Sequence, residues 1–340
     1  MEALNMAERY IAVDNVCAWP NLTQMPDGKI VATIFNQPTH GGWEGDVECW
    51  VSADEGRIWR LGGIPAPHEP GTNRMNVAAG CGHDGALLVL ASGWSRRNPP
   101  GAYSSPVEGE ILPIWVCRSE DGGKNWDRTG SIVPPPLEKV DRIMPYGDIV
   151  RLPNGVLGVC VYSWSFSSPN ECNVYFYTSH DGGRTWNVRG IVREDNTNET
   201  TPLCLPDGRL LAVARTQDNG HLELFNSSDG GATWIPSGPV TLGSQHPGHL
   251  LRLKDGRLLL SYGIRSKGLT GIGARFSMDE GKTWDSPRVI VSFETAPRDC
   301  GYPSSVEVND GTIVTAYYCE GIPAHQRYHM GVIRWKPDEK

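Results

Sequence analysis

The stretch Ser179-His-Asp-Gly-Gly-Arg-Thr-Trp186 contains the motif that decides the fold, S-x-D-x-G-x-x-W. In such a turn the aspartate accepts hydrogen bonds from nearby backbone N–H groups, and the glycine supplies a positive φ. The tryptophan starts the next strand and packs into the core. The motif occurs five times, ending at Trp59, Trp126, Trp186, Trp234 and Trp284. Five copies of one turn indicate a structural unit that is repeated along the chain.

A second repeat alternates with the first. It is an Asp-Gly or Asn-Gly pair between two apolar runs, which is the strongest short signal for a β-hairpin. It occurs six times, at 27–28, 84–85, 154–155, 207–208, 255–256 and 310–311. Each unit is therefore expected to contain four antiparallel strands, joined in order by the Asp-Gly turn, a loop and the Asp-box turn.

The pattern predicts an all-β fold, a six-bladed β-propeller of four-stranded antiparallel blades that fills residues 1–340 as a single domain. The blades are expected at roughly 14–64, 73–132, 142–192, 198–240, 245–291 and 300–336. The sixth unit has no Asp box. The run Arg9-Tyr-Ile-Ala-Val13 is expected to add a closing strand near 9–13, because an unclosed ring leaves two exposed sheet edges.

Composition and charge restrict the partners. The net charge of −8 and the pI of about 5.6 argue against nucleic acid, and no apolar run reaches the roughly 18 residues of a membrane span. The sequence has no Gly-rich phosphate loop and no set of His, Cys or Asp residues at the spacing of metal ligands. We therefore expect no cofactor and no metal. The nine cysteines are scattered and form no CxxC pair, and the sequence shows no signal peptide, so we expect a cytoplasmic location. If a leader was removed beforehand, the expected location is outside the cell. Homo-oligomerisation is left open.

The two repeated turns share one face of the predicted propeller, and the loops that differ between blades lie on the opposite face. We expect function on that variable face and a purely structural role for the Asp boxes. The variable segments, which include Trp94 to Glu110 and Trp164 to Glu171, are rich in Arg, His, Tyr, Trp and carboxylates. This mixture is expected of a sugar-binding cleft.

The Asp boxes and the blade layout resemble the sialidase (neuraminidase) superfamily over about residues 10–335. Sialidases hold the sialate carboxylate with three arginines, and they use a tyrosine nucleophile with a glutamate and an acid/base aspartate. The resemblance implies that Tyr302, in Gly301-Tyr-Pro-Ser-Ser, is the nucleophile. It also implies that Arg215 and Arg265 are the second and third arginines, and that Asp46 is the acid/base.

The sequence departs from the sialidase pattern at three places. Trp19 begins the segment Trp-Pro-Asn where the first arginine would be. The glutamate that assists the tyrosine falls at Thr200, so Glu199 is one residue off and is expected to face the other way in its strand. In sialidases a glutamate supports the first arginine, and the corresponding position here is Tyr318. A shift of two residues in the correspondence would place Glu320 there.

A second resemblance is to sialidase-like propellers that cleave rhamnose from glucuronate with a catalytic histidine. His40, followed by two glycines in a polar loop, is the candidate, because its unperturbed pKa near 6.5 suits acid–base work at neutral pH. Arg74, Arg215 and Arg265 would then hold a uronate carboxylate.

These observations predict an exo-acting glycoside hydrolase of sialidase-like type, acting on an anionic oligosaccharide that ends in sialic acid or a uronic acid. The alternatives are a rhamnosyl-glucuronate-directed hydrolase or lyase that uses a histidine, and a propeller that binds glycan without turnover. The predicted catalytic residues are Tyr302, Asp46 and His40. The predicted substrate-binding residues are Arg74, Arg215, Arg265, Glu199, Trp164, Tyr146 and Glu320.

Overall fold

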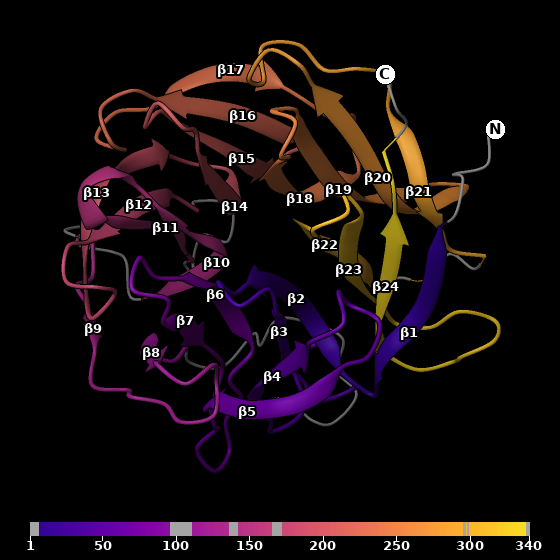
Figure 1. The fold of residues 1–340 in the computed structure, drawn as a ribbon, viewed down its shortest axis with the longest axis horizontal. Helices are drawn as coiled ribbons and strands as arrows, with labels where there is room; N and C mark the ends of the chain where they lie inside the picture. The colour runs from indigo at the N-terminus through magenta and orange to yellow at the C-terminus, as the bar shows by residue number, and fades with distance from the viewer. Residues whose placement is uncertain are drawn as a thin grey trace.

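The computed structural model describes residues 7–95, 111–135, 142–164, 172–294, 297 and 299–337. In these residues the regular structure is β-strand, apart from one short 3-10 turn at Pro153–Gly155. The sheets are arranged around a common centre, which gives an all-β, propeller-like fold (Figure 1). None of the described segments is a helix long and apolar enough to cross a bilayer.

Four of the sheets have four strands each. The first contains β2 (Cys17–Gln24), β3 (Ile30–Phe35), β4 (Val47–Ser52) and β5 (Arg60–Ala66). The second contains β14 (Thr197–Cys204), β15 (Leu210–Thr216), β16 (Leu222–Ser227) and β17 (Ile235–Pro239). The third contains β18 (Gln245–Arg252), β19 (Leu258–Ser266), β20 (Leu269–Ser277) and β21 (Arg288–Ser292). The fourth contains β22 (Cys300–Glu307), β23 (Ile313–Cys319), β24 (His329–Trp335) and β1 (Glu8–Asp14).

The remaining strands form one eight-stranded sheet, so six separate blades are not confirmed. Its members are β6 (Asn76–Cys81), β7 (Leu87–Ser92), β8 (Trp115–Ser119), β9 (Ser131–Ile132), β10 (Ile143–Arg151), β11 (Leu157–Ser163), β12 (Val174–Ser179) and β13 (Thr185–Arg193). The strands β6 and β10 pair in parallel and so join the β6–β8 group to the β10–β13 group. The short β9 pairs with β13 instead of extending its own group.

The Asp-box turns form the hydrogen bonds that their residue types predict. In the second copy, Asp121 Oδ1 accepts the backbone N–H groups of Lys124 (3.0 Å) and Asn125 (2.9 Å). Ser119 Oγ donates to the same carboxylate at 2.8 Å, and Gly123 N donates to Ser119 Oγ at 2.8 Å. The box thus satisfies the turn's own backbone, which is a structural role.

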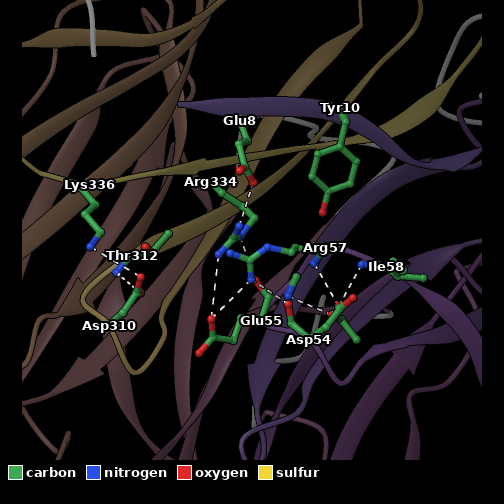
Figure 2. A network of polar contacts seen from close by, with 12 residues as sticks. Glu8, Tyr10, Asp54, Glu55, Arg57, Ile58, Asp310, Thr312, Arg334 and Lys336 are labelled. Atoms are coloured by element: carbon green, nitrogen blue, oxygen red, sulfur yellow. Dashed lines mark hydrogen bonds and ion pairs between the residues drawn. The ribbon is translucent and has the colours of Figure 1, made fainter. Parts of the chain in front are cut away.

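The strand β1 pairs antiparallel with β24, which joins the start of the chain to its end. Figure 2 shows the polar contacts at this seam, centred on the buried Arg334 of β24. Its guanidinium donates to Glu8 Oε2 at 2.8 Å and to the backbone oxygen of Glu55 at 3.0 Å. Glu55 belongs to the first Asp box. The side chain of Arg334 therefore links β24 to β1 within the last sheet and also links the last sheet to the first.

The first strand of each group lies nearest the centre (Figure 1). In five of these strands, β2, β10, β14, β18 and β22, the pairing register shifts within the strand, which marks a β-bulge or irregularity. A bulge turns side chains away from the regular alternation of a strand and re-aims them. Several residues of the candidate site lie inside these bulges.

The core between the sheets is apolar. Between the first and last sheets it includes Val13, Ile34, Trp59 and Val332. Near the bulges of the central strands the buried cluster is rich in aromatic residues, with Trp19, Trp94, Tyr146, Tyr162, Tyr302, Tyr318 and Tyr328. The aromatic cluster therefore lies where the central strands are irregular.

Candidate functional site

Tyr302 and Glu199 form the centre of the site. The Tyr302 hydroxyl donates to Glu199 Oε1 at 2.5 Å, and both residues are buried. Arg215 Nη1 donates to Glu199 Oε2 at 2.6 Å and lies 3.4 Å from the Tyr302 hydroxyl. A carboxylate paired with an arginine and in contact with a phenol can accept the phenol's proton, so the group can convert Tyr302 into a nucleophile.

Glu199 faces the site because strand β14 is irregular. The expectation that Glu199 points away, one residue out of step with Thr200, is wrong. The pairing of β14 with β15 shifts register between Thr197 and Thr200, so the alternation does not hold there. The bulge brings the carboxylate of Glu199 to the phenol of Tyr302 from a sheet two groups away along the chain.

The environment of Tyr302 keeps its hydroxyl protonated. Burial and the charge of Glu199 raise the pKa of the phenol well above its usual 10.0, and Arg215 and Arg265 oppose this only in part. The guanidinium of Arg265 lies over the tyrosine ring at 5.3 Å and donates to the backbone oxygen of Cys300 at 2.6 Å. Because the resting group is a phenol, its attack on a substrate requires that Glu199 take the proton in the same step.

The backbone at Tyr302 has an unusual conformation. Its φ is 52°, which costs a bulky residue roughly 1–3 kcal/mol and persists where the surroundings impose it. The preceding Gly301 has a φ of 108°, and a Cβ there would meet the Cα of Gly263 at 3.3 Å. Glycine is therefore favoured at position 301, and the bend that it permits aims the tyrosine at Glu199.

Aromatic rings surround Tyr302. Trp19 stacks on it with a centroid distance of 5.2 Å and an interplanar angle of 24°. Tyr146 contacts it edge-on at 6.0 Å, and Tyr318 lies against it at 5.5 Å. Trp164 is partly buried and packs against the same aromatic cluster. These rings have apolar faces of the kind that sugars stack on.

A second buried carboxylate lies beside this group. Asp299 accepts hydrogen bonds from the hydroxyls of Tyr318 and Tyr328 and contacts His40 Nδ1 at 2.9 Å. Burial alone would favour the neutral acid. The hydrogen bond and charge of His40, with Tyr318 and Arg265, outweigh it and lower the pKa of Asp299 to about 2. Asp299 is therefore ionised at neutral pH.

Residues 104–315 match the family described as BNR repeat-like domain. The chain belongs to this family. Among solved structures, a protein of unknown function from Dyadobacter fermentans is 25% identical, with a TM-score of 0.80 over 97% of this chain and 98% of that one. A search of the curated proteins finds no match.

Sialidases share the fold of this BNR repeat-like propeller. The Hadza microbial sialidase Hz136 is 16% identical, with a TM-score of 0.72 over 96% of this chain and 68% of that one. A Trypanosoma rangeli sialidase, in complex with 2,3-difluorosialic acid as a covalent intermediate, is 15% identical with a TM-score of 0.71. That match takes in 96% of this chain and 58% of the trypanosomal protein. At these identities the likeness shows the fold alone, which is sialidase-like.

Asp46 lies in a separate group of contacts in this BNR propeller. Its Oδ1 accepts from the backbone nitrogen of His68 at 2.8 Å and contacts His68 Nδ1 at 2.6 Å. Its own backbone nitrogen donates to Asn36 Oδ1 at 2.9 Å. No contact between Asp46 and the Tyr302 group is found in the described residues, and its acid/base role stays a prediction.

In the described residues, the contacts of Arg74 are with residues outside the Tyr302 group. It is buried, donates to both carboxylate oxygens of Glu69 at 2.8 and 3.1 Å, and donates to the backbone oxygen of Pro113 at 2.8 Å. Its guanidinium lies 4.1 Å over the ring of Trp115. These contacts account for its burial without a substrate, and they favour a structural role over the predicted one.

Glu320 lies beside the Asp299 group. It follows β23, the strand that carries Tyr318, and its backbone nitrogen donates to the backbone oxygen of Asp299 at 2.9 Å. The predicted variable segments from Arg96 to Glu110 and from residue 165 to Glu171 lie outside the described residues.

Four side chains of the described site have no role in the sequence-based prediction: Trp19, Asp299, Tyr318 and Tyr328. One signal points to the bulges that place such residues. Trp19, His246 and Tyr302 each precede a proline in a central strand. Proline within a strand marks an edge or a bulge, and the same break in several central strands indicates a shared irregularity.

The part of the chain that the structure describes holds no candidate metal centre. Within it, no group of three or more His, Cys, Asp or Glu side chains is arranged to hold a metal ion. The chemistry that the site can perform with its own residues is nucleophilic attack by Tyr302 and proton transfer by the carboxylates and His40.

Proposed function

We propose that this protein is an exo-acting glycoside hydrolase of sialidase-like type that cleaves an acidic sugar from the end of a glycan. The observation that carries the proposal is the 2.5 Å contact between the Tyr302 hydroxyl and Glu199 Oε1, with Arg215 on the same carboxylate. Tyr302 is the nucleophile and Glu199 is the base that removes its proton. The trypanosomal sialidase of the same fold, held as a covalent intermediate, supports a two-step mechanism.

The arginines favour an anionic substrate. Among the described residues, Arg215 Nε has no hydrogen-bond partner, and Arg265 Nε and Nη2 both donate to the backbone oxygen of Cys300. A small movement of the two guanidinium groups would let both donate to a carboxylate on the bound sugar. Trp19 stacks on Tyr302 where sialidases would have a further arginine, so a uronic acid is the better candidate than sialic acid.

A product screen with purified protein tests the proposal. The protein is incubated with aryl α-sialosides, aryl uronides and uronic-acid-containing oligosaccharides, and released sugars are identified by mass spectrometry. We expect release of a terminal acidic sugar, and we expect Tyr302→Phe and Glu199→Gln to abolish it. Turnover that survives both substitutions would refute the proposal.

A matched control separates chemistry from packing. Tyr317 is another buried tyrosine, whose hydroxyl accepts a hydrogen bond from Arg9 Nε at 2.9 Å, away from the site. Tyr317→Phe removes one buried hydroxyl as Tyr302→Phe does, but it should leave turnover unchanged. Equal losses in both variants would mean that the loss reflects packing.

A second candidate function is favoured by the contact between His40 and Asp299. A histidine held by a carboxylate suits a rhamnosyl-glucuronate hydrolase or lyase in which His40 is the acid/base and Tyr302 only positions the sugar. In that case the screen would release rhamnose or an unsaturated uronate, and His40→Ala would be inactive while Tyr302→Phe would keep part of its turnover. Binding without any product would instead favour a glycan-binding propeller.

We also infer that the scaffold has six blades, two of which share the eight-stranded sheet. The support is the set of six Asp-Gly or Asn-Gly turns, each between the first two strands of one group.

A further inference from the structure

The buried carboxylate of Asp299 has three donors directed at it. The hydroxyl of Tyr318 donates to Oδ1, the hydroxyl of Tyr328 donates to Oδ2 at 2.9 Å, and His40 Nδ1 lies 2.9 Å from Oδ2. The side chain of Asp299 is 5% exposed, whereas that of His40 is 26% exposed. The hydroxyls of two tyrosines thus hold the aspartate in place, and its third partner, His40, is the more exposed residue of the pair.

These contacts fix the tautomer of His40. An ionised carboxylate only accepts hydrogen bonds, so the proton between the two groups belongs to His40 Nδ1. Any proton that His40 exchanges with a substrate then passes through Nε2, as in other histidines whose Nδ1–H is held by a carboxylate.

The ring of His40 is held in one orientation. It lies 6.1 Å from the ring of Trp94 at an interplanar angle of 29°, and it meets Trp19 edge-on at 5.6 Å. The next residue, Gly41, has a φ of 70°, and a Cβ on it would come within 2.1 Å of the Trp94 ring. The close approach of this tryptophan to the loop therefore requires glycine, and it confines the ring of His40 beside Asp299.

The His40–Asp299 pair lies next to the Tyr302–Glu199 pair. Trp19 contacts the rings of both His40 and Tyr302. Tyr318 joins the pairs as well, since its ring contacts Tyr302 at 5.5 Å while its hydroxyl donates to Asp299. The two pairs are therefore in contact with the same two aromatic residues, Trp19 and Tyr318.

We propose that His40 is the acid/base of the Tyr302 site and that Asp299, held by Tyr318 and Tyr328, is the positioning residue that sets its tautomer. This rests on the proposed glycosidase function. It replaces Asp46, whose carboxylate is engaged by His68.

Every proton transfer in the two steps is accounted for by Tyr302, Glu199, His40 and one water molecule. In the first step Tyr302 Oη bonds to the anomeric carbon as the glycosidic C–O bond breaks. Glu199 takes the phenol proton, and protonated His40 Nε2 gives its proton to the leaving oxygen. In the second step neutral His40 takes a proton from water, whose oxygen displaces Tyr302, and Glu199 returns its proton to the phenolate.

The first test needs no substrate. The tautomer of neutral His40 is measured from its ¹⁵N chemical shifts, with the signals assigned by comparison with His40→Gln. We expect the Nδ1–H form in the wild type and a shift toward the Nε2–H form in Asp299→Asn, because the amide cannot accept from all three donors. An unchanged tautomer in Asp299→Asn would overturn the positioning role, whatever the enzyme turns over.

The second test uses the leaving group. In a dinitrophenyl glycoside of the sugar found in the screen, the dinitrophenolate leaves without being protonated. The leaving group of the natural glycoside needs an acid. We expect His40→Gln and Asp299→Asn to lose about 100-fold or more in kcat on the natural glycoside and less than about tenfold on the activated one. The same split in Asp46→Asn, with none in His40→Gln, would overturn the assignment.

A matched control is a His–Asp contact at the seam of the ring. His325 Nε2 lies 2.6 Å from Asp14 Oδ1, outside the Tyr302 contacts. Asp14→Asn should change neither the His40 tautomer nor the leaving-group dependence. If the wild type cleaves no glycoside, the proposed function fails, and the tautomer measurement still decides whether Asp299 positions His40.

Discussion

The hydroxyl of Tyr302 lies 2.5 Å from Oε1 of Glu199, across 103 residues of sequence. Each residue sits in an irregular start of a central strand, β22 for the tyrosine and β14 for the glutamate. In regular strands the two side chains would follow the alternation set by the rest of the ladder. The contact therefore depends on two bulges, and it can be disturbed by changes that touch neither side chain.

The charge of Glu199 should be needed for turnover. Glu199→Gln keeps the shape but cannot take the phenol proton, so we expect kcat to fall by about 10²–10⁴-fold. The measurement is the steady-state rate on the substrate from the screen. Glu223→Gln, on β16, removes a carboxylate outside the Tyr302 contacts and should leave kcat within about twofold. A similar fall there would point to general damage.

Arg74 is expected to act on stability. Arg74→Met removes a buried guanidinium from Glu69 and from the Pro113 carbonyl, so we expect the free energy of unfolding to fall by about 1–3 kcal/mol. Urea unfolding followed by tryptophan fluorescence measures this. A rise in KM of about tenfold or more with unchanged stability would instead show that Arg74 binds substrate, as the sequence predicts.

His246 should make the protein sensitive to mild acid. Burial, with the charges of Arg215 and Arg265, lowers the pKa of His246 from 6.5 to about 2. Below about pH 6.5 the unfolded chain therefore binds a proton that the folded chain does not, and stability falls as the pH falls. From about pH 8 to pH 5 we expect a loss of about 2 kcal/mol from this group.

Urea unfolding at several pH values tests the role of His246. His246→Gln replaces the ring with a neutral amide, so its stability should vary less across that pH range than that of the wild type. The same slope in both proteins would show that His246 is protonated in the folded state or that it titrates in neither state.

The seam contact of Arg334 should stabilise the ring. Arg334 is 4% exposed, and Figure 2 shows its bonds to Glu8 and Glu55. Arg334→Met should lower the free energy of unfolding, measured in urea, by about 1–3 kcal/mol. Lys29→Met breaks an exposed ion pair with Asp27 and should change it by less than about 1 kcal/mol. Equal effects would mean that burial of the seam contact adds no stability.

Much of the fold can be predicted from the sequence, because its signals are local. The Asp-box aspartates, such as Asp121, and the Asp-Gly pairs act through hydrogen bonds and φ angles within a few residues. The number of separate sheets cannot be predicted in this way. It depends on the parallel pairing of Gly147 with Ala78 between two groups, and such a contact leaves no local pattern.

The candidate site is only partly predictable. The motif of Tyr302 has a fixed distance from the following Asp-Gly turn, which makes the tyrosine recognisable in the sequence. The predicted orientation of Glu199 is wrong because strict alternation does not hold through a bulge. The Asp299 contacts join segments from opposite ends of the chain, since His40 lies 259 residues away. Only the closed ring brings them together.

The pairing of β1 with β24 has a consequence for synthesis. Glu8 and Arg334 are 326 residues apart, so at the usual rates of translation the first strand leaves the ribosome roughly 15–65 s before its partner. Throughout that interval its edge is open to pairing with other nascent chains. We expect the yield of soluble protein to depend on chaperones that shield this strand, more than on the stability of the finished ring.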